Sequence, residues 1–84
     1  MNKNTIEKMN ETIGEAFKAF GHEGCLYRAQ ESMKRGDYVA AAKAIDNLKG
    51  SADVRRQKIY SFCGGRSSPF ADALVEAGVC GIRG

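Results

Sequence analysis

The 84-residue sequence contains no tryptophan, and its aromatic residues are four phenylalanines and three tyrosines. A chain of this length buries only roughly 60–65% of the surface that its unfolded form exposes. The scarcity of large side chains therefore predicts one domain, residues 1–84, with a lean core and a net stability of about 5 kcal/mol. Dimerisation, a metal ion or a partner would add to the stability of so small a domain.

Long hydrophobic runs are also lacking. No apolar stretch approaches the length that crosses a bilayer, and the N-terminal segment MNKNTIEKMN lacks the hydrophobic core of a signal peptide. The three cysteines are an odd number, which fits a reducing compartment better than a disulfide framework. We therefore expect a cytoplasmic protein with no membrane association.

The sequence has no strong excess of charge of either sign. The formal net charge is +3 and the pI is about 8.9, which falls short of the dense Lys and Arg content of an obvious nucleic-acid-binding protein. Residues 1–24 carry three Lys and four Glu, so the positive charge lies in the later part of the chain. Charge alone does not decide between partners.

Apolar residues recur at helical spacing in five segments, and no alternating β pattern competes with them. The expected helices cover residues 5–20, 25–35, 38–49, 52–63 and 69–77. The predicted inner faces are Ile59, Phe62 and Cys63 in the fourth helix and Phe70, Leu74 and Ala77 in the fifth. This pattern predicts an all-α protein, a compact bundle of four to five short helices with short polar turns.

Residues typical of helix ends lie at the ends of these segments. The predicted N-caps are Asn4, Asp37, Ser51 and Ser68. Glu7 lies three residues after Asn4 and completes a capping-box pattern. Gly21 and Gly36 are placed to end the first two helices, and Pro69 suits the first position of the last.

The segment CLYRAQESMKRGDYVAAAKAIDNL, residues 25–48, resembles the turn between successive helices of a tetratricopeptide array. The resemblance rests on the Gly-Asp-Tyr turn and on a small residue, Ala42, four positions after the tyrosine. No second copy is visible, whereas solenoids stack several units. The resemblance therefore implies a helical hairpin and carries no function.

The histidine and cysteine residues of the chain are His22, Cys25, Cys63 and Cys80. Together they form a Cys₃His set, which can complete a tetrahedral zinc site, and His22 and Cys25 have the two-residue gap of a metal knuckle. However, the two Cys-x-x-Cys pairs most diagnostic of zinc are absent, and free cysteine usually packs in the core. We therefore predict no cofactor and keep zinc as the alternative for this set.

The stretch FCGGRSSPF concentrates glycine, serine and arginine just before the last predicted helix. Free N–H groups at a helix N-terminus attract negative charge, and glycines let a phosphate approach the backbone. The candidate anion-binding residues are Gly64, Gly65, Arg66, Ser67 and Ser68. The Gly-Lys-Ser/Thr sequence of a Walker loop is missing. An ordinary turn between two helices needs the same residues, and we favour this interpretation.

A basic strip lies in and after the fourth predicted helix and consists of Arg55, Arg56, Lys58, Tyr60 and Arg66. Such a strip suits an acidic protein surface, where Arg and Tyr are favoured anchors, or nucleic acid, whose bases stack on tyrosine. The commonest fate of such charges, however, is a solvated helix face. A helix-turn-helix is only weakly indicated, because the preceding pair of helices lacks its characteristic short turn.

Few residues suit catalysis, since the only histidine, His22, lies in a glycine-flanked loop with no aspartate at triad spacing. We therefore expect a non-enzymatic binding protein that docks on a protein partner as an inhibitor or adaptor, a type common among accessory proteins of phages and mobile elements. The alternative is a nucleic-acid-binding helical domain that uses the basic strip. The near-heptad spacing of the first helix makes a homodimer through that helix a third candidate.

Overall fold

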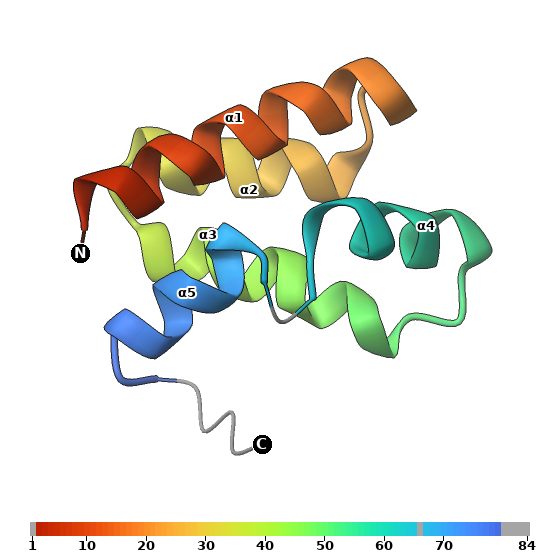
Figure 1. Ribbon diagram of the computed structural model, residues 1–84. Coiled ribbons are helices and arrows are strands. Elements are labelled where there is room, and N and C mark those ends of the chain that lie inside the picture. Colours follow the sequence, from red (N-terminus) through yellow and green to blue (C-terminus); the bar gives the residue numbers. More distant parts are fainter. Residues whose placement is uncertain (1, 66, 80–84) are drawn as a thin grey trace.

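The computed structural model describes residues 2–65 and 67–79, so two predicted site residues, Arg66 and Cys80, lie outside the described part. Within it the chain forms helices and no strand (Figure 1). The helices are α1 (Lys3–Phe20), α2 (Gly24–Lys34), α3 (Tyr38–Asp46), the 3-10 helix η1 (Asn47–Gly50), α4 (Val54–Cys63) and α5 (Pro69–Glu76). The predicted all-α bundle of short helices is therefore confirmed.

Helix α3 is the central element and contacts α2, α4, α5 and η1. In Figure 1, α1 and α2 lie side by side above α3, and α5 and α4 lie toward its two ends. Ala41, Ala42 and Ile45 of α3 are fully buried, and the two alanines let neighbouring helices approach closely. The core joins side chains from all five α-helices.

Helix α1 begins earlier than the sequence predicts. Its N-cap is Asn2, whose side chain accepts a hydrogen bond from the backbone N–H of Asn4 at 2.8 Å, so the capping box at Asn4 is wrong. The reason is a long-range contact: the Glu76 carboxylate of α5 accepts hydrogen bonds from the Asn2 N–H at 2.8 Å and from the Thr5 hydroxyl at 2.6 Å. A tertiary partner thus decides where α1 starts.

The apolar stripe of α1 faces the interior of the bundle. Met9, Ile13 and Ala16 are buried among residues of the other helices. Packing within one chain thus accounts for the near-heptad spacing of this helix, and the homodimer through it stays a prediction.

The hairpin of α2 and α3 forms as the sequence predicts. Gly36 takes a φ of 77°, a left-handed conformation that favours glycine, and ends the first helix. The Asp37 side chain then accepts a hydrogen bond from the Ala40 N–H at 3.1 Å and caps the second. Since α2 and α3 pack along one another, the predicted helical hairpin is confirmed.

Helix α4 begins at Val54, so the predicted N-cap at Ser51 is wrong. The Asp53 carboxylate accepts hydrogen bonds from the N–H groups of Arg55 at 2.8 Å and Arg56 at 3.4 Å. The Gln57 side-chain amide donates to the carbonyls of Lys49, at 3.0 Å, and Ser51. These bonds hold η1 and the extended connection against α4, which keeps Ser51 outside the helix.

Two predicted inner-face residues point elsewhere. Ile59 and Cys63 of α4 are buried as expected, but Phe62 is 46% exposed and lies edge-on to Phe20, with ring centroids 5.5 Å apart. Ala77 lies beyond the end of α5 and is exposed. On α5 the buried residues are Phe70, Ala73 and Leu74. The predicted cap at Ser68 and first-turn Pro69 are confirmed.

Candidate functional site

The basic strip of α4 divides into residues with different environments, and Arg55 is the one engaged within the fold. Its guanidinium donates to the Phe20 carbonyl at 2.6 Å and pairs with the Glu23 carboxylate at 2.9 Å. Phe20 ends α1 and Glu23 precedes α2. Arg55 therefore ties α4 to the turn between α1 and α2, and its charge is balanced within the protein.

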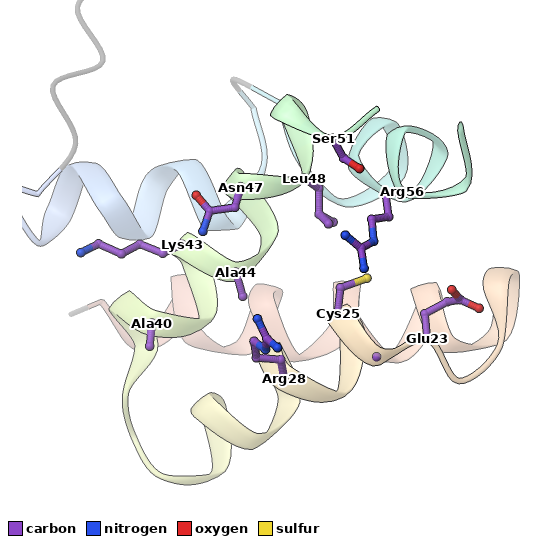
Figure 2. Close-up of a pocket in the computed structure, with 11 residues that line it drawn as sticks. Glu23, Cys25, Arg28, Ala40, Lys43, Ala44, Asn47, Leu48, Ser51 and Arg56 are labelled. Atoms are coloured by element: carbon purple, nitrogen blue, oxygen red, sulfur yellow. The ribbon is translucent and has the colours of Figure 1, made fainter. Parts of the chain in front are cut away.

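Arg56 lies one residue further along α4 and faces another part of the protein. It lines a pocket of about 480 Å³ between α2, α3, η1 and α4. Two more cations line the same pocket: Arg28 of α2 and Lys43 of α3. Figure 2 shows the guanidinium groups of Arg56 and Arg28 reaching the space between these helices, with Lys43 extending outward at the rim. The spacing of these three cations along the chain does not indicate that they share one site.

The small side chains around this pocket create its depth. Ala40 and Ala44 are one helical turn apart on α3 and lie at its wall, and the half-buried Cys25 lies below Arg56 in Figure 2. Asn47 and Leu48 follow from η1. Ala40, Ala44 and Asn47 adjoin the buried stripe of α3 at helical spacing, a sequence pattern from which this second face could have been recognised.

The charge of the pocket is not neutralised from within the described residues. The ion pairs among those residues are Lys49 with Asp46 at 3.3 Å and Arg55 with Glu23 at 2.9 Å, and neither involves a pocket cation. Glu23 supplies the carboxylate that lines the pocket, and Arg55 already balances it. The pocket cations are therefore left to attract an anion from outside the described structure.

The remaining residues of the strip do not join this pocket. Lys58 is exposed on α4 and is absent from the pocket lining. Tyr60 is half-buried and packs against the core, which leaves only part of its ring accessible for stacking. Its role as a partner contact stays a prediction. Arg66 lies outside the described residues.

The glycine and serine loop is a turn, and several of its polar groups are hydrogen-bonded within the fold. The Gly64 N–H donates to the Tyr60 carbonyl at 2.7 Å, and the Ser68 N–H donates to the Gly65 carbonyl at 3.2 Å. The Ser68 hydroxyl is buried and accepts from the Ala71 N–H at 3.1 Å. Ser67 is exposed and Arg66 is outside the described part. These contacts fit the interpretation of a turn between two helices.

The predicted zinc ligands do not assemble within the described residues. No group of three His, Cys, Asp or Glu side chains there could hold a metal ion, and Cys80 lies outside them. Burial raises the pKa of the Cys63 thiol to about 12, and the nearby Cys25 adds to this rise.

His22 belongs to an aromatic cluster that sequence reasoning missed. Its Nδ1 is hydrogen-bonded to the Tyr27 hydroxyl, and its ring lies 5.2 Å from that of Phe17 and 5.3 Å from that of Tyr27. Phe17 and Tyr27 also meet edge to face at 5.3 Å. The cluster joins the end of α1 to the start of α2 and gives His22 a packing role.

Comparison of the chain with protein-family models, with curated proteins and with solved structures finds no match. Across residues 2–65 and 67–79, none of the helices has the length and apolar character needed to span a bilayer. The cationic pocket, lined by Arg28, Lys43 and Arg56, is therefore the candidate binding site among the described residues.

Proposed function

We propose that this chain is a small, non-enzymatic, cytoplasmic binding protein that docks on an acidic protein partner through the cationic pocket, as an inhibitor or adaptor. The observation that supports it is that Arg28, Lys43 and Arg56, from three helices, line one pocket and have no ion-pair partner among the described residues. Arginines beside pockets are favoured anchors of protein interfaces.

A protein partner is favoured over nucleic acid by the fate of the α4 strip. The nucleic-acid interpretation needs Arg55 free for phosphate contacts and Tyr60 free for stacking. Arg55 is bound to Phe20 and Glu23, and Tyr60 packs against the core. The cationic pocket is compact, and it suits an acidic side chain better than a nucleic-acid backbone, whose phosphates need a long row of cations.

The test compares two charge reversals on the same helix. Arg56→Glu places a negative charge at the pocket, whereas Lys58→Glu makes the same kind of change on α4 outside the pocket lining. Nuclease-treated host lysate is passed over immobilised wild-type chain and both variants, and bound proteins are identified by mass spectrometry. We expect a defined acidic protein that wild type and Lys58→Glu retain and Arg56→Glu loses.

Two results would contradict the proposal. One is the same set of captured proteins for all three chains. The other is binding of labelled single- or double-stranded DNA or RNA at micromolar concentration, with a steep salt dependence that Arg56→Glu abolishes, which would establish the nucleic-acid alternative. Thermal unfolding of each variant confirms that the comparison is between folded chains.

A further inference from the structure

The charge balance of the pocket indicates the valence of the anion that it accepts. Arg28, Lys43 and Arg56 are unpaired within the described residues, and the pocket carboxylate, Glu23, is balanced by Arg55. A single carboxylate carries one negative charge, whereas a phosphate monoester carries about −1.5 to −2 at neutral pH. A phosphate monoester dianion therefore neutralises more of the charge of the three pocket cations than a carboxylate does.

The donors also suit a phosphoryl group. A guanidinium presents several N–H donors in a fixed planar fork, which matches the oxygen spacing of phosphate. Figure 2 shows two such forks, from Arg28 on α2 and Arg56 on α4, on opposite helices of the same pocket. Two forks from separate elements can hold one tetrahedral group from two sides, as a single surface arginine cannot.

The N-terminus of α2 adds to the positive potential of the pocket. Gly24 and Cys25, the first two residues of the eleven-residue helix α2, line the pocket, and the Glu23 side chain makes no capping hydrogen bond. The positive end of the α2 dipole therefore lies on the same side as the two guanidinium groups. The volume of about 480 Å³ leaves room for a phosphoryl group together with the side chain that carries it.

We infer that the pocket is a phosphate-monoester site, with Arg28 and Arg56 as its clamp and Lys43 as a rim charge, and that a phosphorylated side chain of the protein partner is its occupant. The identity of the occupant rests on the proposed function. The chemistry of the pocket does not, because free phosphate esters offer the same dianion.

The first experiment measures the chemistry alone. Phenyl phosphate, inorganic phosphate, dimethyl phosphate and acetate are titrated into the full chain at matched ionic strength, with backbone amide shifts as the readout. We expect phenyl phosphate to shift Gly24 and Cys25 and to bind at least about tenfold more tightly than dimethyl phosphate or acetate. Lowering the pH from 7.5 to 5.5 should weaken this binding, because the second phosphate pKa is about 6.

Matched variants locate the site. Arg28→Gln and Arg56→Gln should each weaken phenyl phosphate binding at least about tenfold, and Arg56→Lys should lie between wild type and Arg56→Gln because it keeps the charge and loses the fork. Lys58→Gln should change binding by less than about twofold. Equal binding of phenyl phosphate and acetate, or no effect of the two arginine variants, would overturn the inference.

A second experiment separates this inference from the docking proposal. The captured partner is treated with phosphatase, and its complex is challenged with excess phenyl phosphate. Release by both treatments supports the phosphorylated occupant. If the partner stays bound after both treatments, the docking proposal stands and the inference is overturned. If phenyl phosphate binds at Arg28 and Arg56 but no partner is captured, the phosphate-monoester site stands. The phosphorylated partner is then overturned as its occupant, and the docking proposal is contradicted.

Discussion

Substitution of Gly64 by alanine tests whether Tyr60 belongs to the core or to the surface. A Cβ on Gly64 would lie 2.5 Å from Cε1 and 2.6 Å from Cδ1 of Tyr60, and 3.0 Å from the Tyr60 carbonyl oxygen. Carbon atoms are in optimal contact at about 3.5–4.0 Å, so the ring would have to move by about 1 Å. Because the ring packs against the core, this movement disturbs buried neighbours.

The expected cost is that of overpacking, about 1–3 kcal/mol. For a domain of 60–100 residues each kcal/mol corresponds to about 4–8 °C, so the Tm of Gly64→Ala should fall by about 5–20 °C. The matched control is Gly14→Ala, in the exposed middle of α1, where a Cβ meets no atom within 4 Å. There alanine favours the helix by about 0.5–1 kcal/mol, and the Tm should rise by about 2–8 °C.

The assay is thermal unfolding followed by circular dichroism for wild type and both variants. Repeating Gly64→Ala in a Tyr60→Ala background removes the ring, and the added alanine should then lose most of its cost. A Tm for Gly64→Ala equal to or above that of wild type would refute the packing of the ring over Gly64. The case for Tyr60 as a partner contact would then be stronger.

Three further predictions follow from the core and the contacts between helices. The hydrogen bond from the Thr5 hydroxyl, and then that from the Asn2 N–H, hold the pKa of Glu76 below its usual 4.5. The ionised carboxylate therefore stabilises the fold above pH 4.5, and this stabilisation is lost as the pH falls through the folded pKa. Glu76→Gln should therefore reduce the drop in Tm between pH 6 and pH 3. Ile59→Ala should cost about 2–5 kcal/mol in chemical denaturation and Phe62→Ala about 1 kcal/mol, and equal costs would contradict the assigned faces of α4. Iodoacetamide at pH 8 should label Cys63 more than about tenfold more slowly than an unfolded control, because the thiol is buried with a pKa of about 12. Peptide mass spectrometry measures the labelling, and comparable rates would contradict that burial.

The elements predicted correctly from sequence are those whose causes are local. Asp37 caps α3 because its carboxylate reaches an N–H three residues away, and Gly36 ends α2 because its φ is 77°. The errors arise where a distant residue decides. Glu76 binds the start of α1 from the other end of the chain, and Gln57 draws the connection before α4 into an extended path. Local sequence cannot indicate such partners.

The candidate site was harder to predict because sequence adjacency and spatial adjacency differ on a helix. Successive residues point about 100° apart, so the run Arg55-Arg56 does not form one charged face. Arg55 turns to the α1–α2 connection, and Arg56 lines a pocket that Arg28 of α2 and Lys43 of α3 also line. The basic strip was a grouping by position in the chain, whereas the pocket groups cations by the helices that the core brings together. A charge pattern in a small helical protein is therefore best assessed after the intramolecular partners of each cation have been assigned, because only the cations left over are free to attract a ligand.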